Sequence, residues 1–442
     1  MAMRIGFFLF AALVWSLPAS AQDPDLPPPP GAADFPRHDE DRVSLGRALF
    51  FDPILSGNRN ISCATCHHPT LGSGDGLSLG LGEGAEGLGT ARRAMAATRP
   101  EQRIPRNAPA LWNLGARDFT VLFHDGRVER DSEAPHGIRM PEGRALERPV
   151  SSVLAAQAML PILSADEMAG QPGENPVADA IAADRIAGPE GAWALLAARV
   201  AAVPSYRAAF DWLGVEQPLH MTDIAETLAA FIAHEFRATD SPFDRHLRGE
   251  AGALDPAQTR GMALFYGKAA CADCHAGPFQ TDHRFYAIGL PQFGPGKDEA
   301  QGTYADRGRS AVTGRPEDDY RFRTPSLRNV TLNGPYDHNG AYRDLEAMVR
   351  HHLDPIRSLA QYDRAQAVLA RLPGQTDDWA AMDDLDEVMR IAQAIEIPSV
   401  ALTEAEIADL MAFLAALTDD TAARGRLGAP ETVPSGLPVD RP

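Results

Sequence analysis

The chain has 442 residues, of which 60 are acidic and 41 basic, and its formal net charge is -19. This length suits two or so domains with buried cores, and past the N-terminus no apolar run is long enough to span a membrane. The acidic balance argues against nucleic acid as a ligand and suits a partner that carries positive charge.

The first 21 residues have the layout of a secretory signal peptide. Arg4 precedes an apolar run from 5 to 17, and the small residues Ala19, Ser20 and Ala21 follow it. A membrane anchor is the alternative, but the run is short for a span and ends in a cleavage-type site. The sequence therefore predicts export to a periplasm, with cleavage after Ala21.

The remainder predicts a mainly α fold. A proline-rich tether comes first, because such a segment favours extended backbone. Helical patterns joined by long Gly- and Pro-rich loops follow, with few alternating, strand-like runs. We expect a tether, an N-terminal domain, a C-terminal domain and a flexible tail, at 22–36, 37–238, 239–420 and 421–442.

A faint internal repeat supports the two domains. The segment "GRALFF" (46–51) precedes the first cysteine pair, and "GMALFY" (261–266) precedes the second. Each domain also closes on an amphipathic helix, expected over 222–236 and 403–417. Chance similarity between short apolar segments is the alternative explanation.

All four cysteines lie in two Cys-x-x-Cys-His motifs, "CATCH" and "CADCH". In this motif two thiols add across the vinyl groups of a haem, and the next imidazole reaches the iron from the proximal side. The sequence therefore predicts two covalently bound c-type haems. The attachment residues are Cys63, Cys66 and His67 for the first haem and Cys271, Cys274 and His275 for the second.

Three other uses of these cysteines are weaker. A disulfide across a two-residue gap is tight and does not call for a following histidine. A four-cysteine zinc site needs no histidine either, and a thioredoxin-like pair would lie in a βαβ pattern that this sequence lacks.

Other histidines could provide a second ligand to each iron. Two protein ligands favour electron transfer, whereas an open position lets the iron bind and activate a small molecule. Spacing alone does not choose among the histidines, each of which singly is more often a surface or hydrogen-bonding residue. The candidates are His68, His124, His338, His351 and His352.

With these motifs the chain resembles the bacterial di-haem cytochrome c peroxidases and the related MauG-type enzymes. The resemblance runs from about Leu45 to Leu417 and rests on motifs that are specific in order and spacing. They are "LGRALFFDPILSGNRNISCATCH", "PRNAPALWN", "FHDGR", "QAMLPILSADEM", "GMALFYGKAACADCHAGP" and "FRTPSLRNVTLNGPYDHNGAYRDLEAMVRHHLDP". It implies two cytochrome c-like haem domains, with peroxide at the first haem and electron entry at the second.

The resemblance also implies the residues around the first haem. The family's distal Gln and Glu match Gln157 and Glu167, and the carboxyl would act in general acid-base catalysis on peroxide. Without that match, Glu167 would read as a solvated acid at a helix start. The histidine that caps this iron in classical members is replaced by Glu83, and no histidine lies between His68 and His124. The first haem is therefore expected to be permanently open.

For the second haem, the position of the family's distal Met or Tyr is His352. His351 is the adjacent alternative, and Met348, one helical turn earlier, is another. We expect His338 to pack near the haem without binding iron. At the position of a tryptophan that usually lies between the haems, this chain has His124.

A calcium ion between the haems is a further implication of the resemblance. Asn107, Asn333 and Pro335 match its protein ligands, and oxygen ligands suit this ion. The resemblance also allows a homodimer.

Peroxide reduction is the favoured function, with hydrogen peroxide as oxidant. A small periplasmic protein, either a cytochrome c or a cupredoxin, would donate the electrons. A MauG-like oxidase that uses peroxide to modify a partner protein is the second hypothesis. A di-haem electron carrier without enzymatic activity is the third, and it would need both irons to have two protein ligands.

Overall fold

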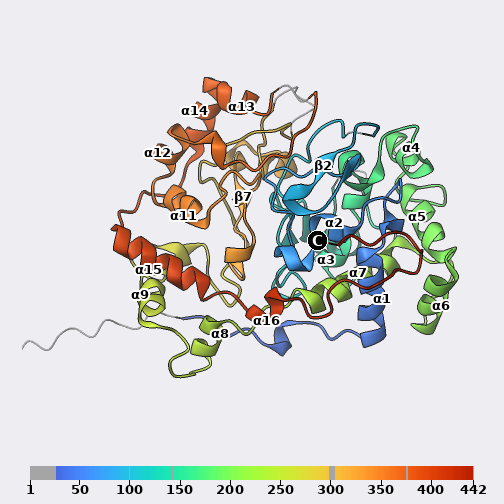
Figure 1. The fold of residues 1–442 in the computed structure, drawn as a ribbon, viewed down its shortest axis with the longest axis horizontal. Helices are drawn as coiled ribbons and strands as arrows, with labels where there is room; N and C mark the ends of the chain where they lie inside the picture. The colour runs from blue at the N-terminus through green and yellow to red at the C-terminus, as the bar shows by residue number, and fades with distance from the viewer. Residues whose placement is uncertain (1–25, 99, 142–143, 298–303, 375–376, 442) are drawn as a thin grey trace, which may run out of the picture.

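The computed structural model describes residues 26–98, 100–141, 144–297, 304–374 and 377–441 (Figure 1). The predicted signal peptide lies outside these ranges. In the described residues, no helix combines the length and the apolar character needed to cross a bilayer.

Helices are the main regular structure and the strands have only two or three residues, which confirms the mainly α fold. The helices up to the middle of the chain are α1 (Glu40–Phe51), α2 (Cys63–Cys66), α3 (Val153–Gln157), α4 (Pro176–Ala182), α5 (Ala192–Ala201), α6 (Pro204–Trp212) and α7 (Met221–Glu235). The later helices are α8 (Pro242–Leu247), α9 (Pro256–Phe265), α10 (Ser310–Thr313), α11 (Leu345–Leu353), α12 (Pro355–Ala360), α13 (Ala380–Asp383), α14 (Leu385–Ala394), α15 (Glu404–Ala415) and α16 (Asp420–Ala423).

The strands pair in small antiparallel sheets. They are β1 (Ala85–Glu86) with β2 (Arg93–Ala94), then β3 (Val121–Leu122) with β4 (Val128–Arg130) and β5 (Ile138–Arg139), and finally β6 (Phe285–Tyr286) with β7 (Phe322–Arg323). We call the part of the structure up to α7 the first module and the part from α8 to α15 the second module (Figure 1).

The first module is built on a close crossing of α1 and α7. Asp39 caps the start of α1 with its side chain. Gly46 faces α7, and a β-carbon at this position would lie 2.1 Å from the carbonyl oxygen of Thr227. Only glycine lets the two backbones approach this closely. Phe50 then packs on Phe231, with ring centres 5.1 Å apart in the core.

The second module repeats this crossing with α9 and α15. Asp255 caps α9, and a β-carbon on Gly261 would lie 1.9 Å from the carbonyl oxygen of Asp409. Phe265 and Phe413 pack behind the crossing with ring centres 5.2 Å apart. The glycine in "GRALFF" and the glycine in "GMALFY" therefore have the same structural task, which explains the sequence repeat.

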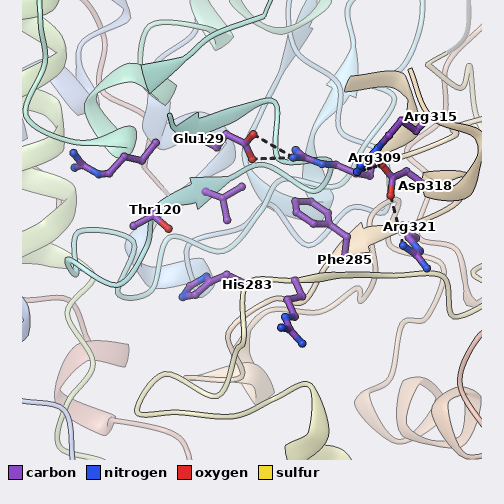
Figure 2. Close-up of a pocket in the computed structure, with 11 residues that line it drawn as sticks. Thr120, Glu129, His283, Phe285, Arg309, Arg315, Asp318 and Arg321 are labelled. Carbon is purple, nitrogen blue, oxygen red and sulfur yellow. Dashed lines mark hydrogen bonds and ion pairs between the residues drawn. The ribbon is translucent and has the colours of Figure 1, made fainter. Parts of the chain in front are cut away.

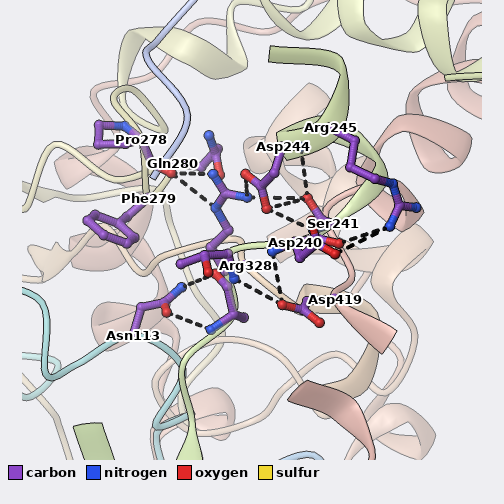
Figure 3. Close-up of polar contacts among 12 residues, drawn as sticks. Asn113, Asp240, Ser241, Asp244, Arg245, Pro278, Phe279, Gln280, Arg328 and Asp419 are labelled. Atoms are coloured by element: carbon purple, nitrogen blue, oxygen red, sulfur yellow. Dashed lines mark hydrogen bonds and ion pairs between the residues drawn. The ribbon is translucent and has the colours of Figure 1, made fainter. Parts of the chain in front are cut away.

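A buried polar network fixes the segment between α7 and α8 (Figure 3). Asn113 pairs with the backbone of Ala238 in both directions, at 2.8 and 2.9 Å. The next two backbone amides donate to Asp419, each at 3.0 Å. Arg328 donates to Asp244, and both side chains are fully buried. The segment that joins the modules is thereby held by side chains from both.

The tail beyond α16 packs along the first module instead of leaving it, which corrects the expectation of a flexible tail. Arg47 donates to the carbonyl oxygen of Gly428 at 2.8 Å, and Ser435 donates to Asp52 at 2.7 Å. Val433 is buried in the first module's core. The proline-rich composition predicted disorder, but polar partners and apolar contacts far away in the sequence hold the segment in place.

Candidate functional site

The first Cys-x-x-Cys-His motif forms the short helix α2 and its end. All of its cysteines are free, and burial raises the pKa of Cys63 and Cys66 to about 12. His67 Nδ1 lies 2.9 Å from the carbonyl oxygen of Ser73. A carbonyl can only accept, so Nδ1 carries the proton and Nε2 keeps its lone pair, as a metal-binding imidazole requires.

The tail lies directly on this motif. Asp440 accepts a hydrogen bond from Thr65, the residue between the two cysteines. Its charge also acts on His68, for which burial lowers the pKa and the Asp440 carboxylate partly offsets that effect. His68 is buried and bonds Thr70 through Nδ1 at 2.8 Å, which fits a bystander next to the proximal ligand.

The second motif has the same arrangement. Its cysteines are free, and His275 Nδ1 lies 3.2 Å from the carbonyl oxygen of Gln280. Burial lowers the pKa of His275 to about 4, and the neighbouring His352 adds to the effect. The imidazole is therefore neutral at pH 7, with Nε2 available to a metal. In each module, the two free thiols and the neutral imidazole that follows them are placed as a covalently attached haem requires.

His352 faces His275 across the second motif. Its Nδ1 lies 2.9 Å from the carbonyl oxygen of Met348, so its Nε2 is also free, and the two ring centres are 6.4 Å apart. Imidazole nitrogens bind metals at about 2 Å, so two rings on opposite sides of one metal have centres roughly 6 to 6.5 Å apart. The observed spacing matches a pair of axial ligands.

The two alternatives for this ligand are placed differently. His351 uses both ring nitrogens, with Nδ1 at 2.8 Å from the Tyr342 hydroxyl and Nε2 at 2.8 Å from the carbonyl oxygen of Ile288. Met348 packs with the apolar cluster around Tyr342 and Phe293. His351 therefore has no free ring nitrogen for a metal, whereas His352 has one.

Glu167 lies on a single π-type turn after Ser164, whose hydroxyl accepts from the Glu167 amide at 3.3 Å. Burial raises the pKa of the Glu167 carboxyl, and the positive charges of Arg127 and Lys297 oppose this only in part. Its charge in turn contributes to the raised pKa of Cys66, which puts the carboxyl in the neighbourhood of the first motif.

Gln157 ends α3 and is buried, with 8% of the residue's surface exposed. Gly82 holds the glycine-rich loop against the turn of Glu167, because a β-carbon there would lie 2.6 Å from the Glu167 carbonyl oxygen. The next residue, Glu83, binds the same turn through its backbone amide, which donates to Asp166 at 3.0 Å. The structure thus gathers Glu83 and Glu167 at one place.

The side chain of Glu83 is buried, and only one of its two carboxylate oxygens accepts hydrogen bonds. Its Oε2 accepts from Asn60 at 2.8 Å and from Asn58 at 3.4 Å, whereas Oε1 has no hydrogen-bond partner. Burial raises the pKa of this carboxyl. A carboxylic acid, and no imidazole, therefore occupies this position in the loop.

The three residues matched to a calcium site lie on neighbouring segments. The amide nitrogen of the Asn107 side chain donates to two backbone carbonyls, and its backbone amide donates to His338 at 2.8 Å. Asn333 accepts from Trp112 through its side chain, which leaves its carbonyl oxygen, like that of Pro335, as the matched ligand. In the described part of the chain, no three His, Cys, Asp or Glu side chains are placed to hold a metal ion. Calcium here would depend on amide and carbonyl oxygens.

His124 connects the two modules. Its Nε2 lies 3.2 Å from the carbonyl oxygen of Asn107, and its own carbonyl accepts from the Arg323 amide at 2.7 Å. His338 stacks on Phe322 with ring centres 3.9 Å apart, and neither of its ring nitrogens has a hydrogen-bond partner, although Nδ1 lies 3.6 Å from the Asp337 carboxyl. The His338 ring is thus buried and stacked on Phe322, and no hydrogen bond from another residue fixes its nitrogens.

Arg106 is a residue that the sequence analysis missed. It donates to Asp125 at 2.5 Å and to Asp306 at 2.6 and 2.7 Å, and all three are buried. Burial alone would raise the pKa of both carboxyls, but the guanidinium outweighs it and holds both pKa values well below the usual range. No local signal marks this triad, because Asp306 is 200 residues away from Arg106.

These features define a two-module, mainly α protein with a c-type haem-binding motif in each module. Comparison with known proteins also indicates a protein with two haems. A family model described as "Di-haem cytochrome c peroxidase" matches residues 40–252. The chain is 33% identical over 314 residues to the methylamine utilization protein MauG of Methylorubrum extorquens, which covers 71% of this chain and 69% of that protein.

Other relatives include the cytochrome-c peroxidase IdrP1 of Denitromonas iodatirespirans, which is 30% identical over 89% of this chain and 85% of its own length. A solved MauG-like protein associated with microbial copper homeostasis has a TM-score of 0.55 and 26% identity, covering 93% of this chain and 97% of that one. The diheme peroxidase BthA from Burkholderia thailandensis, at 23% identity and a TM-score of 0.55 over 92% and 91% of the two chains, shares the fold.

The chain belongs to the di-haem cytochrome c peroxidase family. It is an oxidoreductase with two haems, and the family's chemistry uses peroxide together with a protein electron donor or partner. Members of this family are periplasmic cytochromes.

Proposed function

We propose that this protein is a periplasmic peroxidase that reduces hydrogen peroxide to water with electrons from a small cytochrome c or cupredoxin. The asymmetry between the two motifs carries the proposal. At the second motif two imidazoles with free Nε2 atoms face each other at 6.4 Å. At the first, the charged groups that act on the buried Cys66 include Asp75, Arg92 and Glu167, none of which is an imidazole. This arrangement supports one iron with two protein ligands and one with an open position.

Glu167 is the acid-base group in this proposal. As a carboxylate it would take a proton from one oxygen of peroxide and deliver it to the other oxygen, which leaves as water. The haem, when bound, supplies the iron and the electrons for cleavage of the O–O bond. Gln157 positions the peroxide through its side chain amide. In total, peroxide takes up two electrons and two protons and gives two molecules of water.

Glu83 keeps the first site open in the oxidised protein. A histidine at this position could cap the iron, but this chain has a carboxyl whose Oε2 is already bonded to Asn60 and Asn58. We therefore expect no reductive activation step.

His275 and His352 would hold the second haem, which would be the point of electron entry. A bis-histidine iron has a lower potential than a His/Met iron, since the thioether favours the reduced state. Asn107, Asn333 and Pro335 would provide oxygen ligands for a calcium ion.

A MauG-like oxidation of a partner protein is the second candidate. The identity of 33% to a MauG protein and the absence of methionine at the distal position favour it. His124 weighs against it, because this chain lacks a tryptophan where the family usually has one between the haems.

Steady-state consumption of peroxide by the holoprotein, with reduced cytochrome c as donor, tests the proposal. We expect consumption to be coupled to two oxidised donor molecules per peroxide and to fall to background without donor. Rapid oxidation of the protein by peroxide without donor-dependent turnover would contradict it and favour the MauG-like candidate.

A further inference from the structure

A broad cavity of about 490 Å³ lies between the two modules, lined on one side by β3 and β4 and on the other by β6 and the segment around α10 (Figure 2). Five of its lining residues are arginines, whereas only two, Glu129 and Asp318, are carboxylates. In a chain with 19 more negative than positive charges, this is a local reversal of sign. The arginines are Arg130, Arg284, Arg309, Arg315 and Arg321.

The inner arginine of this cavity, Arg309, already has hydrogen-bond and ion-pair partners within the protein. Arg309 pairs with both carboxylate oxygens of Glu129, at 2.9 and 3.2 Å (Figure 2). The same guanidinium donates to the carbonyl oxygens of Asp125 and Gly126. It also lies over the ring of Phe285, at 4.4 Å from the ring centre. Because its donors are used, the interior does not offer a free cation to a small anion.

Two of the four outer arginines remain free for a partner. Arg130 and Arg284 are exposed, and neither pairs with a carboxylate among the described residues. Arg315 pairs with Asp318 at 2.8 Å, but its side chain is 61% exposed, so that pair is screened by water. Arg321 is shared between Asp318 and Glu396. The free positive charge thus lies at the rim and not in a closed pocket.

The rim adjoins the second haem-attachment segment. The backbone amide of Asp282 donates to the carbonyl oxygen of Cys274 at 2.9 Å, and Tyr286 donates to the Asp282 side chain at 2.7 Å. Arg284 lies between these two residues in the sequence, and its carbonyl accepts from Thr324 at 2.8 Å. A protein seated on the arginines would therefore lie next to the second motif.

We propose that this arginine-lined face is the docking surface for an acidic face of a small electron-donor protein. The inference rests on the proposed function, in which electrons enter at the second haem. It also revises the expectation from net charge: the whole molecule is acidic, yet the contact face selects a partner of negative local charge. Each docked donor loses one electron, and two donors with two protons convert one peroxide to two molecules of water.

Rim charges act mainly on the rate and salt dependence of association, and they leave the chemical step alone. The test uses the double variant Arg130→Glu/Arg284→Glu and the control Arg207→Glu/Arg185→Glu, which makes the same charge change at exposed positions of the first module. A reduced acidic cytochrome c and a basic one serve as probes. We expect the double variant to raise the KM for the acidic donor by about tenfold at low salt. kcat at saturating donor, the KM for peroxide and the control variant should be unchanged.

Direct binding separates this proposal from the proposed function. Titration calorimetry with the oxidised acidic cytochrome measures docking even if the protein turns over no peroxide. Weaker binding by the double variant only, and weaker binding by the wild type as salt rises, would support the docking surface. Equal binding by double variant and control, or tighter binding of the basic cytochrome at low salt, would overturn it.

Discussion

Neighbouring histidines of this chain differ in function because their ring nitrogens have different partners. His352 bonds a carbonyl through Nδ1 only, whereas His351 bonds a hydroxyl and a carbonyl through both nitrogens. The first pattern leaves a lone pair for a metal and the second leaves none. Sequence spacing cannot separate adjacent residues in this way, since the difference comes from Tyr342 and Ile288 in the folded chain.

Replacing His352 by alanine should change the low-spin haem signal and leave the high-spin signal intact, because in the proposed arrangement the substitution removes one of two histidine ligands. Electron spin resonance of the oxidised holoprotein measures both signals. His351→Asn is the matched control and should retain the wild-type spectrum. If the low-spin signal changes in the His351 variant and stays the same in the His352 variant, the ligand is His351, and the assignment to His352 is wrong.

Replacing Glu167 by glutamine should lower kcat with peroxide by about 10²- to 10⁴-fold, since the variant has no proton acceptor. The acid limb of the wild-type pH profile should lie above the usual pKa of glutamate, because burial raises the pKa of Glu167 and only its ionised form accepts the proton. Activity thus falls as pH drops through that pKa. Asp166→Asn, one residue away, should keep turnover. Unchanged kcat in the Glu167 variant would remove this residue from the mechanism.

The two helix crossings show what the sequence could predict of the elements. The repeated glycine was visible as "GRALFF" and "GMALFY", and the crossings of α1 with α7 and α9 with α15 account for it. The packed tail was not visible, because Asp52 and Arg47 bond it from positions almost 400 residues away. Local composition describes a segment, but not the partners that the fold brings to it.

The buried pair between Asp244 and Arg328 should be critical for stability. Asp244→Asn leaves a buried guanidinium without its counter-charge, and we expect a loss of about 3 to 5 kcal/mol in the free energy of unfolding. Asp409→Asn breaks the exposed pair with Arg260 at 2.7 Å and should cost far less. Thermal or denaturant unfolding of both variants measures the difference, and equal losses would contradict a special role for the buried pair.

The molecule as a whole joins two similar modules that perform different tasks. The repeat, the haem motifs and the mainly α fold followed from the sequence, as did the family. The Arg106 triad, the contacts of His124 and the arginine-lined face did not, because each combines residues from both modules. Sequence patterns therefore predicted each module, whereas the interface between them required the structure.

The mass of the intact protein measures both the removal of the signal peptide and the number of covalently attached haems. The mature form should begin at Gln22 and carry two covalent haems. A Cys271→Ala/Cys274→Ala variant should carry one. A wild-type mass without haem, or with residues 1–21 retained, would contradict these predictions.

The central claim is that one iron is held by two histidines while the other keeps an open position for peroxide. A spin resonance spectrum of the oxidised wild-type holoprotein, recorded before any reduction, tests it most directly. We expect one high-spin and one low-spin haem in equal amounts. Two low-spin haems would contradict it.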